Sequence, residues 1–124
     1  MKYEVNYHEG LFEVKTYGDA ELEGFFGFWK ELLAHEKWKP ESRILEDHSE
    51  LNARPFTASD IKILSERAVS MKNKLGNAKL AVVVSRDLEY GMVRMRHAYV
   101  DGNWNVNEDV FRSRDDAIAW LNAV

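Results

Sequence analysis

The sequence predicts a single α/β domain, residues 1–124, with a mixed β-sheet and packed helices in the order ββαβαβαβα. Two opening segments alternate between apolar and polar residues, and strand-like and helix-like patterns then alternate to the end of the chain. The segment 78–85 (AKLAVVVS) is apolar without alternation, as expected of a central strand covered on both faces. A length of 124 residues suits one domain with its own core.

The first elements are expected to be a β-hairpin and a helix. Residues 2–7 (KYEVNY) and 11–18 (LFEVKTYG) alternate, and Gly10 between them can adopt the positive φ of a tight turn. Asp19 is placed to cap the helix that follows. Because Pro40 disfavours helical geometry at the preceding residue, this helix should end near Trp38. Its expected buried face consists of Leu22, Phe25, Phe26, Trp29, Leu32 and Leu33.

The middle of the chain is expected to contain a short strand at 43–47 (RILED) and a second helix from Thr57 to about Leu75. Gly76 is well placed to stop this helix, because a glycine at that position can adopt a left-handed conformation. The expected buried stripe of the helix consists of Ile61, Leu64, Ala68, Met71 and Leu75.

The last third of the chain is expected to add a third helix, a strand and a final helix. The third helix ends at Gly102, and the strand occupies 108–113 (EDVFRS). Ser113 and Asp116 have the spacing of a capping box at the start of the final helix. The third helix is expected to bury Leu88, Met92, Met95 and Tyr99.

Composition argues against several classes of protein. The chain has no cysteine, which excludes disulfides, cysteine-ligated zinc and thiol catalysis. Its longest apolar run, 80–84, is far shorter than the roughly 20 residues of a membrane span. The charged segment 1–10 lacks the apolar core of a signal peptide, so a cytoplasmic location is expected. A net charge of −4 argues against nucleic-acid binding.

No catalytic motif stands out. The sequence lacks GxGxxG, GxxxxGK[ST], HExxH and GxSxG, so the common phosphate-binding, zinc-protease and hydrolase mechanisms have no support. The four histidines are widely spread, and none is paired at metal-ligand spacing. We therefore expect a non-enzymatic protein without catalytic residues, metal or cofactor.

The start of the second helix raises two alternatives. With Thr57 as N-cap, Asp60 can complete a capping box, and Phe56 and Ile61 have the spacing of a hydrophobic staple. Capping explains these residues without any chemistry, and we favour it. The alternative is that Thr57 or Ser59 is phosphorylated.

The acidic segment 46–51 (EDHSEL) lies at the carboxyl end of the strand predicted at 43–47. Its carboxylates and His48 include the donor types that bind a divalent cation, and the carboxyl end of a strand is a common ligand position. Adjacent strand residues point in opposite directions, however, so these acids cannot all converge. We favour a solvated acidic loop.

Two helix faces are candidate interaction surfaces. In the third helix, Tyr90, Val93, Arg94 and His97 share one face, which could bind an acidic partner or an anionic group. The alternative is a solvated helix flank with ion pairs. In the first helix, Phe28 is surplus to the expected core stripe, and Gly24 and Gly27 lie near it. This combination suggests close approach of another element or subunit, as a homodimer patch or an apolar ligand site, or else packing under the hairpin.

The segments RILED, TASDIKIL, KLAVVVS, YGMVRM and VFRSRDDAIAWL, taken together, resemble the STAS domain, the SpoIIAA-like fold of anti-sigma-factor antagonists. The chain is especially similar to small, mostly uncharacterised bacterial proteins of STAS/SEC14 type. The resemblance implies a protein-interaction or ligand-sensing module. The phosphoserine stretch of that family, of D-S-x-G-L type, falls on 57–61 and places Ala58 at the phosphoacceptor position. The resemblance therefore implies a member without the phosphoserine switch.

These observations leave two functional hypotheses. The first is a non-enzymatic module that recognises a protein, a second copy of itself or a small apolar or anionic ligand through the first and third helix faces. The second is a carrier or small-molecule enzyme that binds its ligand at the carboxyl ends of the strands, around Asp47, Thr57, Ser59 and Ser85. An enclosed pocket with convergent polar groups would favour the second, and an exposed patch the first.

Overall fold

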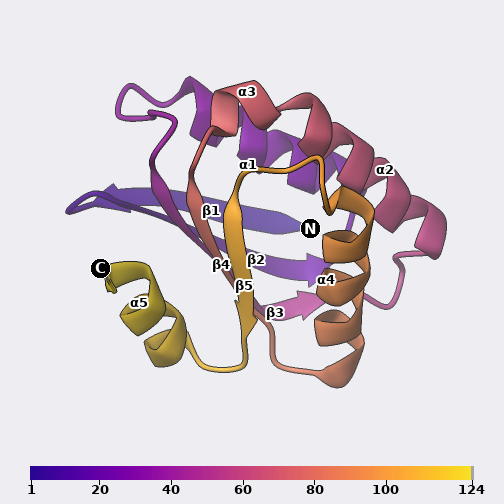
Figure 1. Ribbon diagram of the computed structural model, residues 1–124. Helices are drawn as coiled ribbons and strands as arrows, with labels where there is room; N and C mark the ends of the chain where they lie inside the picture. Colours follow the sequence, from indigo (N-terminus) through magenta and orange to yellow (C-terminus); the bar gives the residue numbers. More distant parts are fainter. Residues whose placement is uncertain (124) are drawn as a thin grey trace.

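The computed structural model describes residues 1–123 and shows one sheet with helices on both faces (Figure 1). Helices α1 to α4 cover one face, which we call the helix side, and α5 lies on the opposite face. In chain order the elements are β1 (Lys2–His8), β2 (Leu11–Asp19), α1 (Leu22–Ala34), β3 (Arg43–Asn52), α2 (Ala58–Ser70), α3 (Lys72–Leu75), β4 (Lys79–Val83), α4 (Asp87–Val100), β5 (Asn107–Phe111) and α5 (Arg114–Asn122).

The sheet is mixed, as predicted. Its strand order is β1-β2-β3-β4-β5, with β1 and β2 antiparallel and all later neighbours parallel. The hairpin turn between β1 and β2 uses positive φ angles at Glu9 (51°) and Gly10 (83°), which confirms the turn predicted at Gly10. The α/β class and the strand and helix order are confirmed, with α3 as a short addition after α2.

Alternation along the central strands separates two apolar layers. On the helix side, Ile44, Leu80 and Val82 pack with the buried residues of β2 and α1. On the opposite face, Leu45 and Val83 pack with residues of α5. Strand β4 is therefore covered on both faces, as its uniformly apolar sequence predicted.

Strand β3 is twice as long as predicted. The prediction of a solvated acidic loop at 46–51 was therefore wrong. The strand continues to Asn52 because β2 pairs with it through Asp19↔Asn52. Glu46, Asp47 and His48 are all buried, at 4–6% exposure. The side chains of Glu46 and His48 face the helix side, and Asp47 lies on the other face with Leu45.

Helix α1 is shorter than predicted at both ends. Asp19 does not cap it, because that residue still belongs to β2 and its carboxylate accepts a hydrogen bond from the Asn52 amide (2.9 Å). The N-cap is Glu21, and the helix ends at Ala34 instead of near Trp38. The fully buried residues of α1 are Phe28 and Leu32, so the predicted core stripe was wrong in omitting Phe28.

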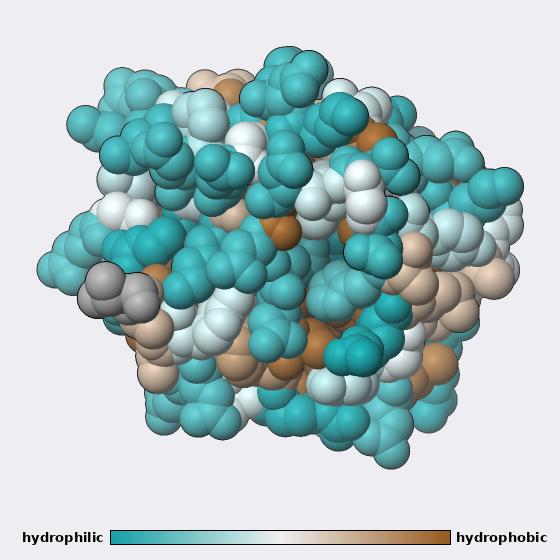
Figure 2. All heavy atoms as spheres, viewed as in Figure 1, coloured by the Kyte–Doolittle hydropathy of each residue, from teal (hydrophilic) through white to brown (hydrophobic). Residues whose placement is uncertain are grey.

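Helix α4 presents a different face to the core than predicted. Leu88, Met95 and Tyr99 are 41–45% exposed. Figure 2 shows this side of the molecule to be mostly hydrophilic, with tan and brown atoms toward its right-hand edge. Glu89 is 4% exposed, because Arg86 and the Ala53 backbone N–H satisfy its carboxylate. Partners outside the helix thus turn polar side chains inward, which the helical pattern alone could not indicate. The other inward-facing residues are Met92, Val93, Arg96 and Val100.

The start of α2 has the predicted capping box. The Asp60 backbone N–H donates to Thr57 Oγ1 (3.1 Å), and the Thr57 N–H donates to the Asp60 carboxylate (2.9 Å). Phe56 and Ile61 lie in one apolar cluster, as the staple predicted.

Replacing Thr57 with alanine is expected to lower the free energy of unfolding by about 1 kcal/mol, because the orphan N–H groups of the first turn lose an acceptor. Chemical denaturation measures this loss. Ser59→Ala is the matched control, since Ser59 is exposed in the same turn and no side-chain hydrogen bond is found for it among residues 1–123. A Thr57→Ala variant no less stable than the Ser59→Ala control would contradict the capping role.

Candidate functional site

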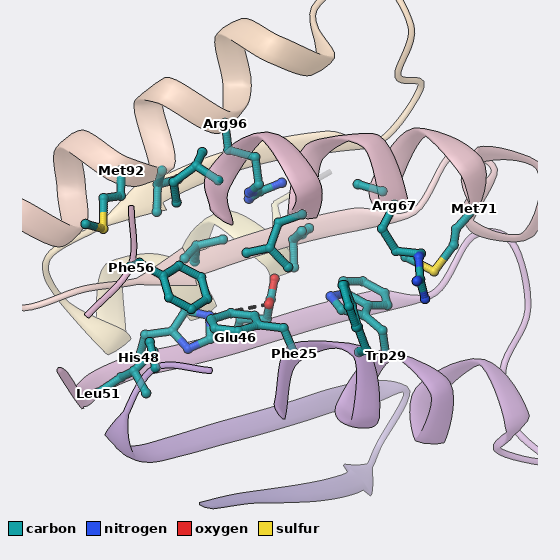
Figure 3. Close-up of a pocket in the computed structure, with 18 of the residues that line it drawn as sticks. Phe25, Trp29, Glu46, His48, Leu51, Phe56, Arg67, Met71, Met92 and Arg96 are labelled. Carbon is teal, nitrogen blue, oxygen red and sulfur yellow. Dashed lines mark ion pairs between the residues drawn. The ribbon is translucent and has the colours of Figure 1, made fainter. Parts of the chain in front are cut away.

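A cavity of about 700 Å³ lies between the sheet and helices α1, α2 and α4; we call it the helix-side cavity (Figure 3). Its volume is within the range typical of small-molecule sites. Most of its lining is apolar and comes from elements far apart in the sequence, including Phe25 and Trp29 of α1, Leu64 of α2, Val82 of β4 and Met92 of α4.

Small side chains leave this space open. Ala68 of α2 and Val93 of α4 both line the cavity, where larger apolar residues would fill it. Helix α4 also contributes Glu89 and Arg96 to the wall; the carboxylate of Glu89 is bound by Arg86 and the Ala53 N–H, and the guanidinium of Arg96 by Glu108.

Three polar side chains meet on the sheet beneath the cavity. The Thr16 hydroxyl lies 2.7 Å from His48 Nδ1, and His48 Nε2 lies 3.4 Å from Glu46 Oε1. The Thr16 hydroxyl also lies 3.4 Å from the Asp47 carbonyl oxygen, so it can donate either to that carbonyl or to Nδ1, according to the tautomer of the imidazole. In Figure 3, Glu46 and His48 rise from β3 with Phe25 and Phe56 beside them.

A β-bulge positions this polar group. The β2–β3 register changes between Lys15↔Asp47 and Tyr17↔Glu50, so β3 has one extra residue opposite Thr16. Bulges redirect side chains and are common beside functional sites. Here the irregularity lies where Thr16 meets His48.

A buried ion pair lies behind the cavity wall. The Arg96 guanidinium binds both oxygens of Glu108, which also contacts His97 Nε2 (2.7 Å). Burial alone would raise the pKa of Glu108, but the positive charge of Arg96 and the hydrogen bonds from His97 and Arg96 lower it below its usual value. Burial would likewise lower the pKa of Arg96, but Glu108 and, less strongly, the charge of Glu46 raise it.

Cationic side chains lie at the outer part of the cavity. Lys30, Arg67 and Lys74 are exposed residues that also contribute to the lining. The Arg67 guanidinium stacks on the Phe26 ring, 4.1 Å from its centroid, and so links α2 to α1 across the cavity. In Figure 3, Arg67 extends from α2 toward Trp29 of α1.

The candidate surface on α1 is internal packing. Phe28 has no exposed surface and packs edge-on against the Tyr3 ring at 6.0 Å, so it cannot contact a second copy of the chain. A Cβ at Gly24 would lie 2.5 Å from Met1 Sδ, and one at Gly27 would lie 2.9 Å from the Tyr3 hydroxyl. The closely approaching element is therefore the start of the hairpin, and the interaction surface proposed for Phe28 was wrong.

The four candidate residues of α4 do not form one free surface. Tyr90 and Val93 pack against the core, and His97 contacts Glu108. Arg94 is exposed. The face differs from the prediction because α4 is rotated so that Val93 and Arg96 point inward.

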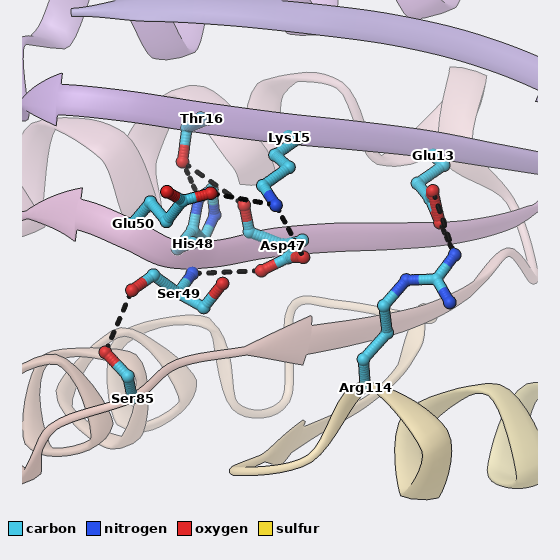
Figure 4. A network of polar contacts seen from close by, with 9 residues as sticks. All are labelled: Glu13, Lys15, Thr16, Asp47, His48, Ser49, Glu50, Ser85 and Arg114. Carbon is cyan, nitrogen blue, oxygen red and sulfur yellow. Dashed lines mark hydrogen bonds and ion pairs between the residues drawn. The ribbon is translucent and has the colours of Figure 1, made fainter.

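The candidate loop site separates into two places. Asp47 lies on the sheet face opposite the cavity, where its carboxylate accepts from the Ser49 N–H (3.0 Å) and lies 4.0 Å from Lys15 Nζ (Figure 4). The Ser85 hydroxyl joins this network by donating to the Ser49 carbonyl (3.0 Å). Thr57 and Ser59 are exposed at the start of α2, away from that network.

The sequence reasoning did not place Thr16 or Arg96 at this site, and it considered Glu46 and His48 only as possible cation ligands in an acidic loop. A signal was available for two of them. If the strand at 43–47 is extended by one residue, alternation places Glu46 and His48 on the same face as the apolar Ile44. Carboxylate and imidazole side chains on an apolar face indicate a polar group within the core.

Two kinds of feature are absent from residues 1–123. No three histidine or acidic side chains lie close enough together to hold a metal ion. None of the helices in this part of the chain has both the length and the apolar character needed to cross a bilayer.

Comparison with solved structures identifies the fold. No family model matches the chain, and no curated protein gives a significant match. The chain is similar to the crystal structure of an uncharacterised protein of the DUF3478 family from Shewanella loihica PV-4, which has a SpoIIAA-like fold. The two share 20% sequence identity with a TM-score of 0.58, over 97% of this chain and 92% of the other. The chain therefore has the SpoIIAA-like fold that its sequence pattern predicted.

Proposed function

We propose that this protein is a non-enzymatic binding module that holds a small apolar molecule in the helix-side cavity, as a ligand sensor or carrier. The observation that carries the proposal is the cavity itself, about 700 Å³ and lined mainly by apolar side chains from α1, α2, α4 and the sheet. A cavity of this size with a few polar groups is the usual form of a small-molecule site. This function combines the ligand-sensing and carrier roles expected from the sequence.

The polar group on the sheet supports binding over catalysis. Thr16 is fully buried, so its hydroxyl is a poor candidate nucleophile. Both ring nitrogens of His48 already face partners, Thr16 on one side and Glu46 on the other. Such a group can orient a bound molecule without reacting with it.

Binding of 1,6-diphenylhexatriene tests the proposal, because this probe has no hydrogen-bonding group and fluoresces when it enters an apolar site. The protein is expected to bind it saturably. Ala68→Phe adds a ring to the cavity wall and is expected to weaken binding at least about 10-fold, since the ring occupies the same space. Ala119→Phe is the matched control, because Ala119 is exposed on α5. Equal binding by the two variants, or no saturable binding by the wild type, would contradict the proposal.

Protein docking is a second candidate function. The specific observation in its favour is the exposed apolar stripe of Leu88, Met95 and Tyr99 on α4. If that stripe mediates self-association, sedimentation velocity should show a larger species that disappears in Met95→Glu. A wild-type chain that sediments as a monomer at high concentration would exclude the homodimer.

A further inference from the structure

The carboxyl group of Glu46 lacks sufficient partners for its position. Glu46 is 4% exposed and lines the helix-side cavity. Within residues 1–123, its polar contact is His48 Nε2 at 3.4 Å, longer than an ordinary N–H···O hydrogen bond. A buried acceptor without a full set of donors costs free energy, and a bound molecule can supply the missing donor.

The nearby cation does not satisfy Glu46. Arg96 binds both oxygens of Glu108, so its guanidinium is already committed to another carboxylate. The remaining acceptor capacity of Glu46 is therefore directed at the cavity, where a ligand would lie.

Trp104 also contributes to the cavity lining, but its Nε1 is buried without a hydrogen-bond partner among the described residues and has almost no accessible surface. A ligand therefore cannot reach that donor. The acceptor that a ligand can reach is Glu46, and a hydroxyl can donate a hydrogen bond to it. An ammonium group can donate as well, but it would have to pass the cationic residues Lys30, Arg67 and Lys74.

From these contacts we propose that the cavity selects an apolar molecule that carries a hydroxyl group, and that Glu46 accepts the hydrogen bond from that hydroxyl. This inference rests on the proposed binding function and specifies its ligand class. It also predicts which apolar molecules bind poorly. A ligand that carries only hydrogen-bond acceptors leaves Glu46 without a donor. A ligand that carries a carboxylate is repelled by the carboxylate of Glu46.

The test compares 1-decanol with its methyl ether, 1-methoxydecane, which differs in lacking the donor. Each is used to displace 1,6-diphenylhexatriene from the wild-type protein, with decanoate as a third competitor. We expect 1-decanol to bind about 10-fold or more tightly than the ether, the effect of one hydrogen bond to a charged acceptor. We expect decanoate to bind more weakly than 1-decanol.

Glu46→Leu removes the acceptor and should reduce the ratio of the two affinities to near one. This change replaces a buried charged group with an apolar one of similar size, which proteins often tolerate. Glu50→Leu is the matched control, since it makes the same substitution on the same strand at an exposed residue outside the cavity lining, so the ratio should persist.

The outcomes of these measurements distinguish a failure of the proposed binding function from a failure of the proposed ligand class. If 1,6-diphenylhexatriene does not bind the wild type, the proposed function fails and the ligand class fails with it. If the probe binds but the ether or decanoate competes as well as 1-decanol, only the ligand class is wrong. A preference for 1-decanol that survives Glu46→Leu would also overturn the role of Glu46. The wild-type comparison decides the question even if the Glu46 variant does not fold.

Discussion

Replacing Phe28 with alanine is expected to lower the free energy of unfolding by about 3–5 kcal/mol, the usual cost of removing a buried aromatic side chain. Phe28 has no exposed surface and contacts the rings of Tyr3, Phe25 and His48 at centroid distances of 5.4–6.2 Å. Its loss would remove packing between α1, the hairpin and β3 at once. Urea denaturation followed by tryptophan fluorescence measures the change.

Phe26→Ala is the matched control for this prediction. Phe26 is two residues away on the same helix, but it is partly exposed and lines the existing cavity, where it stacks with Arg67. Its removal should cost clearly less than that of Phe28, because it leaves fewer packed neighbours without contacts. Equal losses for the two variants would contradict the central position of Phe28.

Phe28 also shows where sequence reasoning succeeds and fails. Periodicity identified the helix but chose the wrong centre for its buried face, because seven aromatic or leucine residues compete within 22–33. The hairpin resolves the choice by packing Met1 and Tyr3 onto Gly24 and Gly27. The two glycines did indicate close approach of another element, although not which element it was.

The prediction of strand β3 failed for a different reason. The predicted strand ended at residue 47, because the polar run from Glu46 to Glu50 separates Leu45 from the next apolar residue, Leu51. The strand continues because β2 supplies backbone partners as far as Asn52, and the buried charges find side-chain neighbours on β2, such as Thr16 and Lys15. Such partners are distant in sequence, so a local pattern cannot reveal them. The cavity was missed for the same reason, since it depends on elements that meet only in the fold.

Two properties of α4 connect the fold to the proposed function. Its inward residues include Glu89 and Arg96, whose charged groups are bound by Arg86 and Glu108 and so do not fill the centre of the helix layer. Its apolar residues Leu88, Met95 and Tyr99 remain outside instead. A helix that followed the predicted orientation would place those large side chains toward the sheet and fill much of the cavity. The polar contacts of α4 therefore maintain the space in which a ligand would bind.

Glu108→Gln is expected to lower the free energy of unfolding by about 3–5 kcal/mol at neutral pH, because it leaves the Arg96 guanidinium without its counter-ion. The Glu108 side chain is 3% exposed, so solvent offers little compensation. Asp87→Asn is the matched control. It removes the partner of Arg112 in a solvent-exposed pair, and such pairs contribute less than about 1 kcal/mol.

The pH dependence of the Glu108→Gln effect provides a sharper test than its size. The pKa of Glu108 is lower in the folded protein than its ordinary value of 4.5, so the unfolded chain takes up a proton first as the pH falls. The stabilisation is therefore complete above about pH 4.5 and is lost as the pH drops through the lower pKa of the folded state. Denaturation curves at several pH values should show the deficit of Glu108→Gln shrinking across that acidic range, because the wild-type carboxylate is then protonated as well. A deficit that is the same in neutral and strongly acidic solution would mean that the amide disturbs packing, and that the charge pair with Arg96 is not the source of the stability.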